Sequence, residues 1–300
     1  MFRDGCVGSR MINALSFDVE EYFHAAALAN AFGGAPWTSL PSRVCASTER
    51  ILDLLDENAA RGTFFVLGWV AERQSDLVRK IQRRGHEVAC HGYSHRLIYE
   101  QSIDEFREET HRAKSILEDI IGLPVEGYRA ASFSITRKSL WALDVLVDAG
   151  FRYDSSIFTI FHDRYGIPGA PRQPHRLTLA DGRQLLEFPP STARFGPMTL
   201  PVGGGGYFRL LPYWYTSSMI KRLVLRERVP LMFYLHPWDI DAGQPVGRVS
   251  RLTRVRHYFN ASRCADRLAR LLRQYRFATV SESLRALDEA LPQHSYDVPG

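Results

Sequence analysis

Short apolar runs alternate with amphipathic segments along most of this 300-residue chain, and this alternation limits the folds that it can adopt. The expected strands are residues 12–18, 63–67, 87–90, 185–188, 231–235 and 277–280, with a further short strand at Tyr128. One of the helical segments between them starts with the capping pair Ser102 and Glu105 and ends before Gly122. Such alternation predicts a parallel sheet covered by helices, and both a barrel and an open doubly wound sheet satisfy it.

Two further features bear on the fold class. No GxGxxG motif follows the first strand, so a dinucleotide-binding site has no support in the sequence. The proline- and glycine-rich segment 151–212 interrupts the alternation, and it predicts long loops of the kind that often carry binding residues.

The chain is basic, with 38 Lys and Arg against 33 Asp and Glu and a formal charge of +5. Nearly all of these basic residues are arginines, and they are spread over many segments. Two explanations account for this charge balance: an anionic partner, or a genome whose codon bias favours arginine on the solvated surface. The densest run is Arg248, Arg251, Arg254 and Arg256, which suits an anionic polysaccharide or a lipid-phosphate substrate, whereas no nucleic acid is expected.

The cysteines and the chain ends indicate the cellular compartment in which the protein is expected. The cysteines Cys6, Cys45, Cys90 and Cys264 form no CxxC pair, which predicts free thiols in a reducing environment. No signal-peptide core precedes the first strand, and no apolar run approaches the roughly 18 residues of a membrane helix. We therefore expect a cytoplasmic protein, with the inner face of the membrane as an alternative. Residues 1–11 are expected to be a disordered leader and residues 291–300 a flexible tail.

Chemically capable side chains follow several of the expected strands. Asp18, Glu20 and Glu21 come at the end of the first strand, the pair His91 and His95 follows the third, Arg129 follows Tyr128, and His236 closes the run 231–235. In parallel α/β folds the carboxyl ends of the strands carry the active site. The sequence therefore predicts that these groups converge at one rim.

The types of these residues indicate metal-assisted hydrolysis. His91 and His95 together with one carboxylate make the three-ligand set of a catalytic zinc site that leaves a position for water. Asp18 and Glu20 lie on the same side of an extended strand, so that one can bind the metal while the other acts as a base. His236 is the candidate acid for the leaving group.

Four motifs occur along the chain in a set order: Ser16-Phe17-Asp18, His91-Gly-Tyr-Ser-His95, Arg129 and Leu235-His236-Pro237. In this order they resemble the motifs of the polysaccharide deacetylases (NodB homology, carbohydrate esterase family 4), over roughly residues 12–240. The resemblance implies a distorted (β/α)7 barrel with long rim loops. It also implies removal of acetyl groups from sugars such as N-acetylglucosamine with one divalent metal, expected to be zinc, with cobalt, nickel, manganese and iron as alternatives.

The resemblance assigns roles to individual residues. Asp18 matches the catalytic base, His91 and His95 match the metal ligands, and His236 matches the acid that protonates the leaving amine. The family's metal carboxylate usually follows the base directly, but Val19 stands there, so Glu20 is the expected substitute and Glu21 the fallback.

Two assignments concern residues that orient others. Arg129 matches the arginine that orients the base, although Ala131 replaces the proline usual two positions later. Asp154 is expected to hold His236 in its tautomer, although the family's Asp-Trp motif is absent and an Asx turn explains Asp154 equally well.

Finer matches resemble a bacterial subgroup found with exopolysaccharide gene clusters and exosortase systems. They include residues 18–24, 132–136, 187–190, the glycine run 203–206 and residues 236–239. Members of that subgroup carry a C-terminal extension, which corresponds here to residues 241–290 and is expected to pack on the barrel of residues 12–240.

Several aromatic side chains are expected to contact the sugar, because aromatic faces pack well on sugar rings. These predicted substrate contacts are Tyr93, Phe133, Tyr207, Phe208 and Trp238. Of these, the pair beside the glycine run is favoured, because glycines permit close approach of the backbone. Ordinary core packing is the equal alternative for each.

The sequence thus predicts a metal-dependent hydrolase that removes N-acetyl groups from a sugar polymer or a lipid-linked oligosaccharide in bacterial exopolysaccharide or cell-wall metabolism. Two alternatives stay open: a cyclic amide or ureide hydrolase of the allantoinase-like type, and a non-catalytic carbohydrate-binding relative. The sequence leaves the oligomeric state open.

Overall fold

The computed structural model describes residues 11–162, 164–196, 198–287 and 290–296. Seven parallel strands follow one another around its main sheet: β10 (Met232–Leu235), β1 (Asn13–Val19), β2 (Thr63–Val66), β3 (Glu87–Cys90), β4 (Gly127–Tyr128), β5 (Tyr153–Asp154) and β7 (Gln184–Glu187). Three further strands extend it: β6 (His175–Thr178) antiparallel to β7, β12 (Gln293–His294) beside β6, and β11 (Phe277–Ala278) beside β1.

The two ends of this row of strands meet. The segment that leaves β7 reaches β10, where the Ser191 N–H donates to the Met232 carbonyl at 3.2 Å and the Met232 N–H donates to Ser191 Oγ at 2.7 Å. These two bonds join the first and last strands of the row through the segment after β7, without a regular ladder between β7 and β10. The barrel is therefore closed but irregular. The expected distorted seven-stranded barrel is confirmed.

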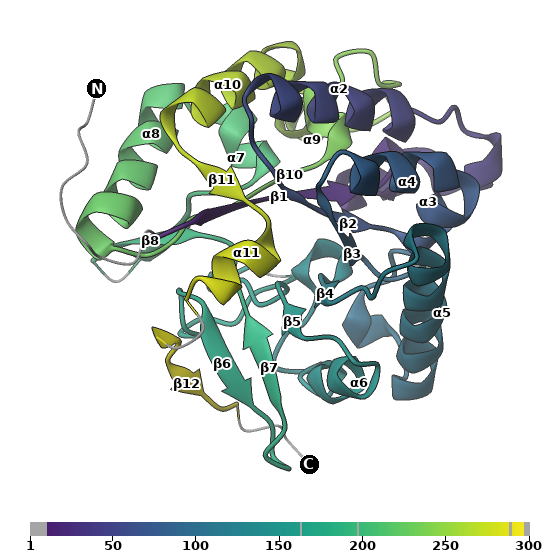
Figure 1. Ribbon diagram of the computed structural model, residues 1–300. Helices are drawn as coiled ribbons and strands as arrows, with labels where there is room; N and C mark the ends of the chain where they lie inside the picture. Colours follow the sequence, from purple (N-terminus) through teal and green to yellow (C-terminus); the bar gives the residue numbers. More distant parts are fainter. Residues whose placement is uncertain (1–10, 163, 197, 288–289, 297–300) are drawn as a thin grey trace.

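Helices cover the outside of the barrel (Figure 1). Those that follow the first strands are α2 (Val44–Glu57), α3 (Gly68–Arg73), α4 (Ser75–Arg83), α5 (Ile103–Ile121) and α6 (Ala142–Asp148). The later ones are α7 (Gly205–Leu210), α8 (Tyr213–Lys221) with a π-helical continuation over Arg222–Glu227, α9 (Arg251–Tyr258) and α10 (Ala261–Gln274). The last helix, α11 (Val280–Arg285), lies at the amino ends of the strands. A short α1 (Ala29–Phe32) lies between β1 and α2.

Local sequence explains where these elements begin and end. In α5, Ser102 and Glu105 form the expected capping box, and Gly122 takes the left-handed conformation, with φ 69°, that ends the helix. The central strands β1 and β2 are buried on both faces, as parallel strands under helices must be. No helix in the described part of the chain has the length and apolarity needed to cross a bilayer.

The prediction of long loops over residues 151–212 is wrong in part. This segment contains the β6–β7 pair, a separate hairpin of β8 (Thr192–Phe195) and β9 (Met198–Pro201), and α7. Its prolines misled the prediction, because several of them lie between these elements. Pro174, for example, directly precedes β6.

The predicted chain ends fall mostly outside the described residues. Of the expected leader, residues 1–10 are not described, and neither are residues 297–300 of the expected tail. Within that tail the structure instead places Gln293–His294 in β12, paired with β6.

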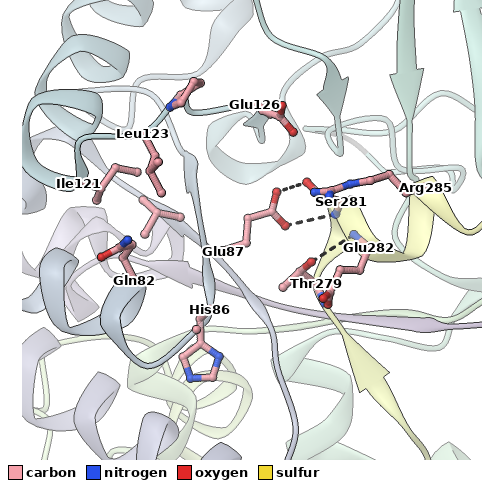
Figure 2. A pocket seen from close by; sticks show the side chains of 13 residues that line it. Gln82, His86, Glu87, Ile121, Leu123, Glu126, Thr279, Ser281, Glu282 and Arg285 are labelled. Atoms are coloured by element: carbon pink, nitrogen blue, oxygen red, sulfur yellow. Dashed lines mark hydrogen bonds between the residues drawn. The ribbon is translucent and has the colours of Figure 1, made fainter.

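Glu87 ties α11 to the amino ends of the strands. Its carboxylate accepts hydrogen bonds from Thr63 Oγ1 at 2.5 Å and from Tyr153 Oη at 2.9 Å. It also accepts hydrogen bonds from the backbone and side chain of Ser281 (Figure 2). A hollow of about 280 Å³ lies here. In a parallel fold this end of the strands serves stability.

Candidate active site

The predicted functional residues converge at the carboxyl ends of four strands. Asp18 lies in β1 and Glu20 directly after it, while His91, Arg129 and His236 each follow the last residue of β3, β4 and β10. All five are buried or nearly so. Because parallel strands end at one rim, residues up to 218 positions apart lie within one cavity.

Glu20, His91 and His95 form a three-residue group whose ligand atoms all lie within 4.8 Å of one another. Glu20 Oε2 lies 2.5 Å from His95 Nε2 and 3.9 Å from His91 Nε2. Two imidazole nitrogens and a carboxylate oxygen are the donor set of a catalytic zinc site. These residues therefore fit a divalent metal ion.

Neighbouring groups hold this donor set in place. His91 Nδ1 lies 2.8 Å from the Arg129 carbonyl. When the Nδ1–H group donates to this carbonyl, Nε2 is unprotonated and is the atom that can bind the metal. Trp238 Nε1–H donates to the other oxygen of Glu20 at 3.2 Å. His95 takes a positive φ of 57°, which brings its ring back toward Glu20.

Electrostatics favour the metal-binding protonation states of Glu20 and His91. Burial opposes ionisation of Glu20, but the imidazoles of His95, His236 and His91 outweigh it and hold the pKa of Glu20 well below its ordinary value. Burial also lowers the pKa of His91, which favours its neutral form. An ionised carboxylate and a neutral imidazole are the forms that bind a metal.

Glu21, the fallback ligand, points elsewhere. Its carboxylate accepts hydrogen bonds from Ser42 Oγ at 2.5 Å and from the Arg43 N–H at 2.9 Å, at the start of α2. Of the two alternatives, the geometry thus favours Glu20.

Asp18 is held by Arg129. Arg129 Nη1 donates to Asp18 Oδ1 at 2.6 Å and to Ser16 Oγ at 2.9 Å, and the guanidinium lies 4.0 Å from the centre of the Phe65 ring. The second guanidinium nitrogen, Nη2, donates to Ser155 Oγ. Since Oδ1 is occupied by Arg129, Oδ2 is the oxygen of Asp18 that remains for proton transfer.

His236 lies opposite this oxygen, and Asp239 rather than Asp154 contacts it. His236 Nε2 is 3.8 Å from Asp18 Oδ2, while Nδ1 is 3.0 Å from Asp239 Oδ2. Asp239 is fully buried and also accepts a hydrogen bond from Arg209 Nε at 2.7 Å. Burial lowers the pKa of His236, but Asp239 and the carboxylates of Glu20 and Asp18 raise it above its ordinary value.

The predicted contact between Asp154 and His236 is wrong. Asp154 is buried beneath the barrel rim, where its carboxylate bonds Ser156 and Glu187. Burial and the adjacent Asp154 carboxylate raise the pKa of Glu187 well above its ordinary value, which favours its protonated form. The sequence feature that could have identified Asp239 is its position three residues after His236, with Pro237 between them. This spacing forms a capping box in the 3-10 turn Pro237–Ile240.

Of the predicted substrate contacts, Phe133 and Trp238 line the cavity at the metal group. Phe133 follows Ser132 in a turn where both residues have positive φ, 53° and 51°, a strained backbone that directs the ring into the cavity. Trp238 stacks on His236 with ring centres 4.2 Å apart. Sequence reasoning missed Tyr165, Tyr234 and His257, which complete this wall.

The other three predicted contacts lie elsewhere. Phe208 is 1% exposed and packs against Phe233 in the core, so its placement on the rim is wrong. Tyr93 is turned toward α3 and α5, where its hydroxyl donates to Glu72 and Arg112 covers its ring. Tyr207 stands behind the cavity wall and hydrogen-bonds with Tyr165.

The glycine run serves the barrel itself. A Cβ on Gly203 would come within 2.7 Å of the Met232 carbonyl, and one on Gly205 would overlap the Asp239 carboxylate. Gly204 has a φ of 122°, which side chains rarely adopt. The close approach that these glycines permit is therefore to β10 and to the partner of His236.

Two hollows meet at the metal group. The inner cavity, about 200 Å³, is lined by Asp18, Glu20, the two histidine ligands and His236. A larger groove of about 820 Å³ runs beside it between the segment 23–37 and residues 94–100. Both are bordered by Ala26, His95 and Ser132, so an extended molecule in the groove reaches the metal group.

Comparison with known proteins agrees with this geometry. Residues 41–153 match the polysaccharide deacetylase family, and residues 155–285 match a domain of unknown function, DUF3473. The chain carries a polysaccharide deacetylase domain. The DUF3473 match covers β6 to α11, so it contributes His236 and Asp239 to the site of the deacetylase domain.

Curated relatives match over part of their length. A peptidoglycan-N-acetylglucosamine deacetylase of Bacillus cereus is 32% identical over 98 residues, which are 32% of this chain and 36% of the relative. A chitooligosaccharide deacetylase of Bradyrhizobium is 28% identical over 106 residues, which are 35% of this chain and 45% of the relative. The chain thus spans less than half of the length of these two relatives.

Solved structures share the deacetylase fold. A Mycobacterium smegmatis structure ascribed to the polysaccharide deacetylases aligns with a TM-score of 0.64 at 20% identity, covering 96% of this chain and 93% of that one. A mutant of a Bacillus anthracis CE4 family pseudoenzyme with restored enzymatic activity aligns with a TM-score of 0.50 at 14% identity, covering 91% and 67%. At these identities the likeness concerns the fold alone.

Proposed function

We propose that this protein is a metal-dependent hydrolase that removes N-acetyl groups from an acetylated sugar polymer or lipid-linked oligosaccharide. The observation that carries the proposal is one cavity that combines the metal donor set with Asp18 and His236, whose facing atoms lie 3.8 Å apart. A carboxylate base and an imidazole acid on either side of a metal group suit amide hydrolysis.

Glu20, His91 and His95 would hold the metal, proposed to be zinc, which when bound polarises the acetyl carbonyl and acidifies water. Asp18 Oδ2 accepts the proton of the attacking water while Arg129 fixes the other carboxylate oxygen. His236, kept protonated by its acidic neighbours, donates a proton from Nε2 to the departing amine. The backbone N–H of Tyr93 or Ser94 is the proposed donor to the oxyanion.

The groove supports an extended glycan as the substrate. It is several times larger than the inner cavity and carries aromatic side chains, among them Trp37 and Tyr99, on which sugar rings can pack. A small cyclic ureide would fill the inner cavity and leave this groove without a role. The named activities of the peptidoglycan and chitooligosaccharide deacetylases also favour a polymer of N-acetylated sugars.

The finer assignments extend this proposal. Membership of the exopolysaccharide-associated subgroup, with residues 241–290 as an extension packed on the barrel of residues 12–240, rests on the sequence motifs described above. A bacterial cytoplasmic location, with the inner face of the membrane as the alternative, rests on the same sequence reasoning.

Acetate release from N-acetylglucosamine oligomers, measured with the zinc-loaded protein, tests the proposal. Asp18→Asn should lower turnover by about 10²–10⁴-fold while metal content stays at the wild-type level, because Asp18 is outside the metal donor set. Hydrolysis of a cyclic ureide in place of the oligomer would favour the ureide hydrolase. Tight oligomer binding without acetate release would mark a non-catalytic binding protein.

A further inference from the structure

An exposed apolar stripe lies along α9, outside the active site. Leu252, Val255 and Phe259, at the end of the helix, are 60%, 51% and 48% exposed. Their spacing of three and four residues places them on one side of the helix. Val246, in the loop before α9, is 54% exposed. Large apolar side chains grouped in this way mark an interaction surface.

Arginines flank this stripe without acidic partners. Arg248, Arg251, Arg254 and Arg256 are all exposed, and none of them forms an ion pair with a residue that the structure describes. The sequence contains no Asp or Glu from residue 242 to residue 265. Elsewhere on the surface, by contrast, arginines such as Arg84 and Arg183 pair with nearby carboxylates.

The helix is fixed to the barrel through its other side. The buried Arg209 donates hydrogen bonds to the carbonyls of Arg256, His257 and Phe259 at its carboxyl end, and Ser250 caps its amino end. His257 is 4% exposed and bonds Gln244 at 2.9 Å. The apolar stripe is therefore held outward by a helix that is already packed.

We propose that α9 and its preceding loop form a docking surface for an anionic phospholipid membrane. Apolar side chains on one face and arginines beside them are the features with which an interfacial helix inserts between lipid headgroups. A second copy of this chain would bring arginines against arginines. A soluble polyanion would pair with the arginines but would not account for the exposed Leu252, Val255 and Phe259.

The surface lies close to the catalytic histidine. His257 stacks on Trp238 with ring centres 4.6 Å apart, and Trp238 in turn stacks on His236. A protein bound to a membrane through α9 thus holds its active site near the lipid surface, where a lipid-linked acetylated sugar would be presented.

Flotation of the full chain with vesicles tests the proposal. The protein should bind vesicles of phosphatidylcholine and phosphatidylglycerol in a three-to-one ratio and not vesicles of phosphatidylcholine alone. Arg251→Gln with Arg254→Gln should weaken binding about 25-fold, since each arginine near an anionic surface contributes about fivefold. Leu252→Ser with Val255→Ser should weaken it by about tenfold or more.

Leu225→Ser with Arg226→Gln is the matched control, because it makes the same kinds of change at exposed positions in the π-helical turn after α8. This control should bind as the wild type does. All variants should release acetate from soluble oligomers at the wild-type rate, so a failure of docking is separable from a failure of the proposed deacetylase.

Three results would overturn the docking proposal. One is absence of binding to the anionic vesicles. Another is equal loss of binding in the control and in the α9 variants. The third is retention by a soluble polyuronate that competes with vesicles and is unaffected by Leu252→Ser with Val255→Ser, which would identify a polyanion site instead.

Discussion

Replacing Asp239 by Asn isolates the group that positions the catalytic imidazole. The wild-type carboxylate accepts from the His236 N–H at 2.8 Å, contacts Nδ1 at 3.0 Å and accepts from Arg209 at 2.7 Å. An asparagine amide has one acceptor oxygen, so its NH₂ group must face either Nδ1 or the guanidinium. In either orientation the imidazole loses its counter-charge, and where the NH₂ group faces Nδ1 it also loses the acceptor that defines its tautomer.

The expected losses are large in activity and moderate in stability. Turnover should fall by about 10²–10⁴-fold, the range for loss of a general acid or of its correct tautomer. Removing one partner of a buried ion pair costs about 3–5 kcal/mol. The decrease in the free energy of unfolding should lie at the lower end of that range, because Arg209 keeps its bonds to three backbone carbonyls.

The pH profile gives a readout that lost stability alone would not change. Asp239 helps to raise the pKa of His236, so the protonated acid should be lost at lower pH in the variant. The alkaline limb of kcat/KM for acetate release should therefore shift to lower pH. The matched control is Asp241→Asn, because Asp241 pairs with Arg43 and does not contact His236. Wild-type turnover and an unshifted alkaline limb in Asp239→Asn would refute this account of His236.

Three further predictions follow from named contacts. His95→Ala should lose bound metal, measured by elemental analysis, whereas Ala at the exposed His111 should retain it; equal retention would exclude His95 as a ligand. Glu187 keeps a proton on folding because its pKa is raised, so wild-type stability should fall as pH rises through that pKa. Glu187→Gln should therefore lose less free energy of unfolding than the wild type as pH rises above 4.5, measured by chemical denaturation, and parallel curves would contradict this. Phe208→Ala should lower the free energy of unfolding by about 3–5 kcal/mol and leave KM unchanged, because Phe208 lies in the core. Phe133→Ala should raise KM, because Phe133 lines the cavity. A raised KM in Phe208→Ala would instead place Phe208 at the substrate.

The barrel and the metal group could be predicted because they depend on local signals. Apolar runs locate the central strands, and the parallel arrangement then brings the residue after each strand to the same rim. For this reason Glu20, His91 and His95 were placed together from residues more than 70 positions apart. The resemblance makes Glu20 the expected ligand and Glu21 the fallback. The structure separates the two, because Glu20 Oε2 lies 2.5 Å from His95 Nε2 whereas Glu21 contacts the start of α2.

The wrong predictions concern side chains whose positions depend on tertiary packing. Asp154 was assigned by analogy, but the turn after Pro237 brings Asp239 to the imidazole over three residues. Phe208 follows a glycine run that suggested a loop, yet those glycines permit α7 to pack on β10, which turns the ring into the core. Composition alone cannot distinguish a glycine that admits a ligand from one that admits a neighbouring strand.

Acetate release from N-acetylglucosamine oligomers before and after metal removal tests the central claim most directly. Chelation should abolish release by the wild-type chain, and added zinc or another divalent ion should restore it, while Glu20→Gln with its altered ligand set should not recover at the same metal concentration. Release that persists in the chelated protein, or a zinc-loaded wild-type chain that releases no acetate from any N-acetylated oligomer, would contradict the proposed function.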